Sequence, residues 1–288
     1  MQLKPSFNDY KILFIDLDGT LLNDKSCISD ENIKYLKKFR EKNIFIVICT
    51  GRPLNNVIDK CETIIFEKNE KNIFIVASNG AEIFDYSQNK ILNESVIPLN
   101  LVAKIWKYCE AKQLFIFAFF NHKKNFFLIN TFEKFFQDTA KHVLYHCEEF
   151  LCIPKVVSSN DFKSNHYLLN KIHIINYLNN HQKIINDLYL LSNNNVDISL
   201  SSDAVLEITN KGINKGYGVK FICDKLNIPL EHTISIGDNG NDISMFQVTG
   251  LSATLKSAAD IAKNNAKIII DKTNNESIIK HLYQLFEE

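Results

Sequence analysis

Residues 12–22 read Ile-Leu-Phe-Ile-Asp-Leu-Asp-Gly-Thr-Leu-Leu, and this stretch decides the fold. Its first four residues form an uninterrupted apolar run, which predicts a short strand buried on both faces of a parallel sheet. Asp16 and Asp18 follow where the strand ends, and Gly19 marks a turn. A bare Asp-x-Asp-Gly would predict only a turn, but ligands of open α/β sheets bind at the carboxyl ends of strands. The two carboxylates are therefore candidates for chemistry.

The same pattern of a strand followed by a helix recurs on both sides of a long interruption. Apolar runs predict strands at 44–49, 73–77, 205–208 and 233–236. Helices are expected from a cap at Ser29 or Asp30, and at 215–226 and 277–286. Strands that alternate with helices in this way predict an α/β fold with a doubly wound parallel sheet and right-handed crossovers.

The middle of the chain breaks this pattern and predicts a second domain inserted into the first. Strands are expected at 114–120, 126–129 and 171–175, and helices at 99–113, 132–145 and 182–190. A chain of 288 residues is long enough for two compact units. We therefore expect a core of residues 1–84 and 197–288 and an inserted α+β domain of residues 85–196.

Bulk composition limits the partners of the protein. The 33 basic and 33 acidic residues cancel, so no global positive field attracts nucleic acid or an acidic membrane. The longest apolar runs, 44–49 and 114–120, fall far short of the roughly 20 residues that span a bilayer. Seven scattered cysteines without a Cys-x-x-Cys pair favour reduced thiols. These observations predict a cytoplasmic protein with no nucleic-acid or membrane partner, and they leave its oligomeric state open.

Three further polar clusters lie at strand ends or at the start of a helix. Thr50 and Gly51 close the strand at 44–49, where a hydroxyl and turn N–H groups can hold phosphoryl oxygens. Lys215 begins a helix and offers a compact positive charge to a phosphate. The segment Gly237-Asp238-Asn239-Gly240-Asn241-Asp242 closes the strand at 233–236. Asp238 is placed there to ligate Mg²⁺, which prefers oxygen ligands.

The Thr-Gly turn and the lysine are each more typical of a structural turn and a solvated side chain, and the Gly237–Asp242 segment could also be a polar loop that caps the next helix, but together the clusters fit one reaction. Parallel strands bring their carboxyl ends to the same edge of a sheet. Four carboxylates gathered there would repel a phosphate dianion unless a divalent cation and Lys215 offset their charge. The sequence therefore predicts a Mg²⁺ cofactor.

The four clusters, in this order, resemble the motifs of the haloacid dehalogenase superfamily. Asn79-Gly80-Ala81, Leu206-Glu207-Ile208 and the long insertion resemble its Cof-type sugar phosphatases, which carry a large α/β cap between the second and third motifs. The resemblance implies a Rossmann-like core with an α+β cap. It also implies a Mg²⁺-dependent phosphatase that hydrolyses small phosphate monoesters, such as sugar phosphates.

The resemblance implies a role for each site residue. Asp16 is the nucleophile and forms an aspartyl phosphate, Asp18 acts as general acid and then as general base, and Lys215 neutralises developing charge. The metal site comprises Asp16, the backbone carbonyl of Asp18, Asp238 and Asp242, the last steadying either the metal shell or Lys215. The phosphoryl oxygens are expected to be held by Thr50, Gly51 and Asn241.

Two alternatives stay open. A phosphomutase uses the same aspartates to transfer phosphate between hydroxyl groups, although the Cof-like features favour hydrolysis. A non-catalytic regulator could bind a phosphorylated metabolite, but it would need no proton-transferring Asp18. The insertion also contains six histidines and a patch of phenylalanines. A structural role is the expected one for these residues, so no residue of the insertion is assigned to the substrate. The histidines are His122, His142, His146, His166, His173 and His181.

Overall fold

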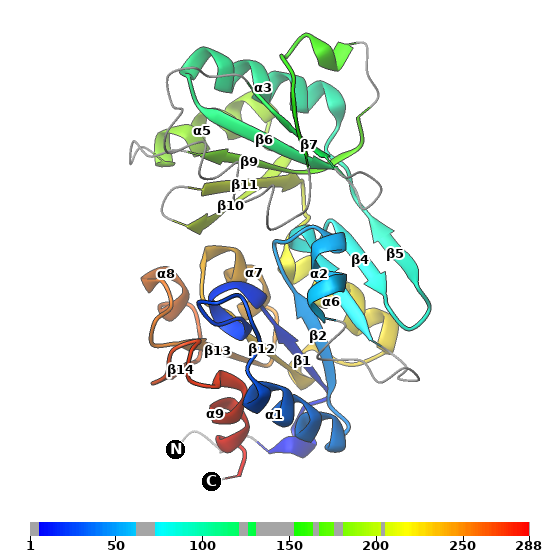
Figure 1. Cartoon of the computed structure of the whole chain (residues 1–288), viewed down its shortest axis with the longest axis vertical. Helices are drawn as coiled ribbons and strands as arrows, with labels where there is room; N and C mark the ends of the chain where they lie inside the picture. The colour runs from blue at the N-terminus through cyan, green and yellow to red at the C-terminus, as the bar shows by residue number, and fades with distance from the viewer. Residues whose placement is uncertain are drawn as a thin grey trace.

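The computed structural model describes residues 6–61, 73–120, 126–130, 153–163, 167–175, 181–202 and 205–287. Two sheets with their helices form two units, one above the other in Figure 1. We call the unit built on the eight-stranded sheet the core and the unit built on the six-stranded sheet the cap. In the described ranges, no helix combines the length and apolar character needed to cross a membrane.

The core sheet has the strand order β14-β13-β12-β1-β2-β3-β4-β5. Its parallel strands are β1 (Ile12–Ile15), β2 (Phe45–Cys49), β3 (Phe74–Ala77), β12 (Thr233–Ile236), β13 (Leu251–Leu255) and β14 (Ile268–Ile270). β4 (Glu82–Asp85) and β5 (Lys90–Glu94) extend one edge as antiparallel strands. β1 lies between β12 and β2, so the segment that carries Asp16 occupies the middle of the sheet.

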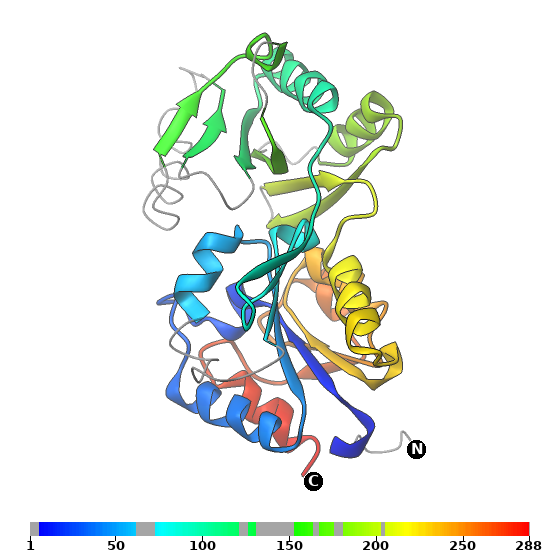
Figure 2. The same ribbon diagram turned by 90° about the vertical axis from the view of Figure 1, so that its right-hand side faces the viewer.

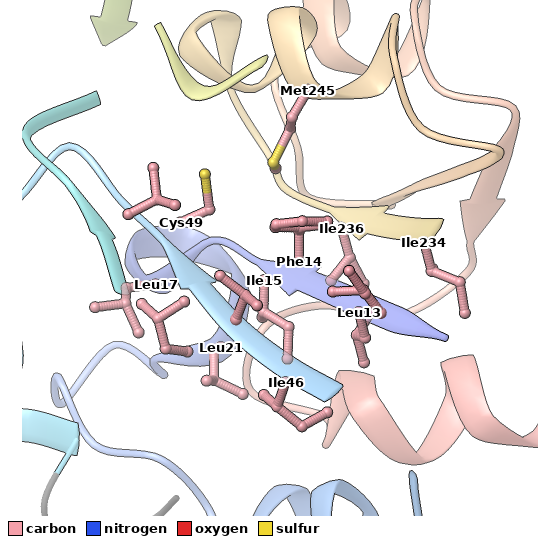
Figure 3. Packing of buried hydrophobic residues seen from close by; sticks show 14 of the residues in the cluster. Leu13, Phe14, Ile15, Leu17, Leu21, Ile46, Cys49, Ile234, Ile236 and Met245 are labelled. Carbon is pink, nitrogen blue, oxygen red and sulfur yellow. The ribbon is translucent and has the colours of Figure 1, made fainter. Parts of the chain in front are cut away.

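Helices cover both faces of the core sheet. They are α1 (Asp30–Glu41), α2 (Leu54–Cys61), α6 (Lys215–Leu226), α7 (Ile243–Phe246), α8 (Asp260–Lys263) and α9 (Ile278–Gln284). Figure 2 shows α1 and α9 on one face and α6 on the other. Between these layers the fully buried Phe14, Ile15 and Ile236 pack together (Figure 3). The predicted doubly wound α/β core is confirmed.

The cap sheet has the strand order β10-β11-β9-β6-β7-β8. The strands are β6 (Phe115–Phe120), β7 (Phe126–Ile129), β8 (Ile153–Val156), β9 (Leu169–Ile175), β10 (Val196–Ser202) and β11 (Val205–Asn210). α3 (Leu99–Lys112) and α5 (His181–Ser192) pack on one face, where Trp106 and Leu188 meet apolar residues of the sheet such as Ile172. The helix expected at 132–145 lies outside the described residues.

The junctions between core and cap lie later in the chain than the expected 84 and 196. The hairpin of β4 and β5 belongs to the core sheet, which therefore continues to Glu94. β11, which was expected to resume the core, pairs with β9 and β10 of the cap. An apolar strand pattern reports burial and not the identity of the partner strand, because pairing depends on contacts distant in sequence.

Candidate active site

Three loops of the site begin where neighbouring parallel strands end. Asp16 follows β1, Asp238 follows β12 and Thr50 follows β2. The register places Ile15 level with Ile236, the last residue of β12, and with Ile48, one residue before the end of β2. The Asp16 N–H donates to the carbonyl of Ile236 over 3.0 Å. The carboxyl ends of these strands thus gather at one edge of the sheet, as the sequence predicts.

Lys215 joins two carboxylates of this edge from the first turn of α6. Its fully buried Nζ lies 2.6 Å from Asp16 Oδ1 and 2.6 Å from Asp242 Oδ1. Burial by itself lowers the pKa of Lys215, but Asp16 and Asp242 raise this pKa well above its usual range. Lys215 is therefore a permanent cation in the middle of the site.

Asp242 uses both of its carboxylate oxygens within the protein. Oδ1 pairs with Lys215, and Oδ2 accepts hydrogen bonds of 2.9 Å from the backbone N–H groups of Asp238 and Asn239. A Cβ at Gly237 would collide with the Asp242 carboxylate, so this glycine makes room for it. Asp242 therefore orients both Lys215 and the loop that carries Asp238.

Asp16, Asp238 and Asp242 form a cluster that fits a metal ion. One carboxylate oxygen from each lies within 4.8 Å of the others. Burial, with Asp242 and Asp238 adding to it, raises the pKa of Asp16 well above its usual range despite the opposing charge of Lys215. Burial and Asp242 raise the pKa of Asp238 to about 7. When all three carboxylates are ionised, their charge exceeds that of Lys215, and a divalent cation that prefers oxygen ligands would balance the excess.

The loop after β1 supports the Asp238 carboxylate. Thr20 Oγ1 donates to Asp238 Oδ1 over 3.1 Å. Gly19 has a φ of +73°, in the left-handed region, and a Cβ at this position would collide with the Asp238 carboxylate. Glycine is thus required here both by the backbone conformation and by the close approach of the Asp238 carboxylate.

The residues expected to hold phosphate lie on the loops around this cluster. Thr50 Oγ1 accepts from the Arg52 N–H over 3.1 Å, and the Gly51 carbonyl accepts from a cap lysine, Lys171. The Asn241 amide donates to Asn79 Oδ1 over 3.4 Å and to a cap carboxylate over 3.3 Å. These contacts place Gly51 and Asn241 where the core loops meet the cap, with Thr50 directly before Gly51 in the same loop.

Asp18 makes an ion pair that the sequence analysis did not anticipate. Arg52 Nε lies 2.7 Å from Asp18 Oδ2, and Arg52 Nη2 lies 2.5 Å from Asp18 Oδ1. The Arg52 side chain is 4% exposed and that of Asp18 is 52% exposed, so a fixed guanidinium holds an accessible carboxylate. Arg52 also donates to Asn56 over 2.6 Å. The one feature of the sequence that pointed to this pair is that Arg52 directly follows the Thr50-Gly51 turn.

A second charged cluster, on the cap, was also missed. Lys171 and His173 on β9 and Glu207 on β11 are all buried, and both Lys171 and His173 contact Glu207. The signal in the sequence was a charge within an apolar strand, Leu206-Glu207-Ile208, and the alternation of Lys171 and His173 along another. Such residues rarely occupy buried strand positions without partners.

Comparison with known proteins identifies the family. Residues 13–282 match the family described as haloacid dehalogenase-like hydrolase. A curated relative, the 5-amino-6-(5-phospho-D-ribitylamino)uracil phosphatase YcsE of Bacillus subtilis, is 25% identical over 272 residues, which are 94% of each chain.

Solved structures show the same fold along nearly the whole chain. The subclass IIB sugar phosphatase BT4131 aligns with a TM-score of 0.77 at 23% identity, covering 95% of this chain and 98% of its own. A haloacid dehalogenase-like hydrolase from B. subtilis aligns with a TM-score of 0.79 at 21% identity, covering 95% and 99%. The resemblance noted from the four motifs is confirmed, and the chain belongs to the haloacid dehalogenase-like hydrolases.

Proposed function

We propose that this protein is a Mg²⁺-dependent phosphatase that hydrolyses small phosphate monoesters, sugar phosphates in particular. The observation that carries the proposal is the convergence of Asp16, Lys215, Asp238 and Asp242, which come from three separate segments of the chain. The names of YcsE and BT4131, a phosphatase and a sugar phosphatase, support the same reaction class.

Asp16, the Asp18 carbonyl and Asp238 would hold the Mg²⁺ ion. When bound, the ion supplies positive charge that offsets the carboxylates and the phosphate. Asp242 fixes Lys215 and the loop that carries Asp238. Its Oδ1 accepts from Lys215 Nζ, and its Oδ2 accepts from the backbone N–H groups of Asp238 and Asn239. Lys215 faces the Asp16 oxygen and stabilises the negative charge of the phosphoryl group in transfer.

The proposed reaction proceeds in two displacements at phosphorus. A carboxylate oxygen of Asp16 attacks the phosphorus, the bond from phosphorus to the ester oxygen breaks, and Asp18 gives a proton to the departing alkoxide. Asp18, now a carboxylate, then takes a proton from a water molecule that attacks the aspartyl phosphate. The bond from phosphorus to Asp16 breaks, inorganic phosphate is released, and the Asp16 carboxylate is regenerated.

To donate a proton to the leaving group, Asp18 must give up at least one of its two hydrogen bonds with Arg52. Both of its oxygens accept hydrogen bonds from Arg52, so the pair holds the carboxylate in place. Donation of a proton in the first displacement requires that substrate binding loosen this pair.

A direct test is phosphate release from a panel of phosphorylated sugars by the purified full chain. We expect release with Mg²⁺, loss of release with a chelator, and recovery when Mg²⁺ is added back. Appearance of an isomerised sugar phosphate without free phosphate would instead identify a phosphomutase. Binding of a phosphorylated sugar without any turnover would identify a regulator.

Metal binding is testable without turnover through Asp238→Asn. Saturating Mg²⁺, at about a hundredfold above its Kd, is expected to raise the melting temperature of the natural protein by about 5–10 °C. Asp238→Asn should remove most of this shift, because it replaces a charged ligand by an amide. Asp260→Asn is the matched control, since that side chain is 94% exposed. Equal Mg²⁺ shifts in both variants would count against the proposed metal site.

Gly19→Ala is expected to lower phosphate release about 100-fold, because the added Cβ displaces the Asp238 carboxylate. It should also destabilise the fold by about 1 kcal/mol through its positive φ. Gly212→Ala separates the two effects, since Gly212 has a φ of +77° and a Cβ there would meet nothing within 4 Å. Steady-state kinetics and calorimetry of both variants check this, and a similar loss of activity in both would contradict it.

A further inference from the structure

Three buried polar side chains lie on the face of the cap sheet opposite α3 and α5. Lys171 and His173 alternate along β9, and Glu207 lies opposite His173 on β11. Their exposed fractions are 1%, 7% and 4%. β10 and β11 are the cap strands nearest the core in Figures 1 and 2. The cluster therefore lies where the cap meets the catalytic loops.

The cluster contacts the core through the residues expected to bind phosphate. Lys171 Nζ donates to the Gly51 carbonyl, and Asn241 donates to Glu207 Oε2 over 3.3 Å. Asn79, on the loop after β3, also donates to Glu207 Oε2, over 2.6 Å. A group held by this cluster would therefore be next to a phosphoryl group held by Gly51 and Asn241.

The charges of the cluster balance one another. Lys171 Nζ lies 3.2 Å from Glu207 Oε1, and His173 Nε2 lies 2.8 Å from the same oxygen. Burial raises the pKa of Glu207, but Lys171 and His173 outweigh it and hold this pKa well below its usual range. With a charged lysine and a charged glutamate, the cluster offers donors and acceptors but little net charge. Such a site suits a neutral partner rich in hydroxyl groups.

A gain in stability is a weak reason for burying these charged residues. Burying two charges costs free energy that their attraction only partly repays, and well-packed apolar residues often do as well or better. The neighbours on the same face are apolar rings, with Lys171 Nζ 5.2 Å from the Phe119 ring centre and the His173 ring 5.2 Å from that of Phe117. Apolar side chains at these three positions would continue this packing without burying a charge.

We propose that Lys171, His173 and Glu207 bind the hydroxyl groups of the leaving alcohol and make the enzyme selective for neutral sugar or polyol phosphates. This inference rests on the proposed phosphatase function. Substrate hydroxyls would replace the present contacts of Lys171 with Gly51 and of Glu207 with Asn241. The nearby Phe117 and Phe119 rings supply an apolar flank for the carbon skeleton.

The test compares kcat/KM for a hexose phosphate with kcat/KM for phenyl phosphate, which has no hydroxyl group on its leaving alcohol. Glu207→Gln and Lys171→Met are expected to lower the value for the hexose phosphate by about 100-fold, through lost hydrogen bonds to charged groups. The value for phenyl phosphate should fall about tenfold less, because that ester offers these residues no hydroxyl group and loses only their contacts with Gly51 and Asn241. Tyr108→Phe is the control, since it removes a 2.8 Å hydrogen bond to Asp187 between the cap helices.

The double variant Lys171→Met/Glu207→Gln separates recognition from packing. Each single change leaves one buried charge without its main partner, whereas the double change removes both. If the pair only stabilises the cap, the double variant should recover melting temperature and hexose phosphate turnover together. We expect melting temperature to recover and selectivity to stay lost.

The outcomes distinguish this inference from the proposed function. Equal losses on both esters, or no loss on either, would overturn the inference while Mg²⁺-dependent turnover of phenyl phosphate still supports a phosphatase. Recovery of selectivity in the double variant would overturn it as well. If the natural protein hydrolysed no ester in a Mg²⁺-dependent way, both this inference and the proposed phosphatase function would be wrong.

Discussion

Asp16→Asn is expected to lower Mg²⁺-dependent phosphate release by on the order of 10⁴-fold or more. The substitution keeps the size of the side chain but replaces the attacking carboxylate oxygen by an amide. Steady-state phosphate release from a hexose phosphate measures the loss. Mass spectrometry of acid-quenched protein is expected to find a phosphorylated chain for the natural protein and none for the variant.

The fold should survive this change. Burial and the carboxylates of Asp242 and Asp238 raise the pKa of Asp16, so removal of its charge lessens repulsion while Lys215 keeps Asp242. We therefore expect a melting temperature no lower than that of the natural protein. Asp24→Asn is the matched control, because the Asp24 carboxylate is exposed and accepts from amide groups of a surface loop. Turnover above about a tenth of the natural rate in Asp16→Asn would rule out the covalent route.

Lys215→Met is expected to reduce the free energy of unfolding by about 3–5 kcal/mol and to abolish turnover. The side chain is fully buried, and its Nζ lies 2.6 Å from both Asp16 and Asp242. Methionine fills a similar volume but leaves those two carboxylates buried without their cation. Urea denaturation followed by circular dichroism measures the loss of stability.

The reason for the loss can be checked with Mg²⁺. A divalent cation should restore more stability to Lys215→Met than it adds to the natural protein, because it supplies part of the missing positive charge. Turnover should not return, since the ammonium that faces the transferred phosphate is absent. Lys220→Met, an exposed position on the same helix, should lose little stability. A loss below about 1 kcal/mol in Lys215→Met would show that the carboxylates do not depend on this lysine.

Most of the core could be predicted because its signals are local. A strand buried on both faces needs an uninterrupted apolar run, so Ile12–Ile15 and Thr233–Ile236 were recognisable without any partner. The cap strand β6 and the helix α3 were found in the same way. The expected junctions at 84 and 196 did not match the sheets, because β11 has the same apolar pattern whether it joins the core or the cap.

The convergence of the candidate residues could be predicted, but not their contacts. Strand-end carboxylates and a helix-start lysine pointed to Asp16, Asp238 and Lys215, which the structure brings together, because parallel strands end at one edge of the sheet. The bidentate pair of Arg52 with Asp18 could not be read from the chain, since the two residues are joined only through the packing of β1 beside β2.

Residue types and their order along the chain establish the reaction class, because carboxylates, hydroxyls and a lysine have the same chemistry in any fold that brings strand ends together. Folding alone selects which of these groups meet: Lys215 between Asp16 and Asp242, and Glu207 of the cap against Asn79 of the core. The physical reason is distance. Lys215 and Asp16 meet only once the core sheet is assembled, and Glu207 and Asn79 only once the cap lies against the core. Each pair is more than a hundred residues apart in the chain, and no local pattern encodes that approach.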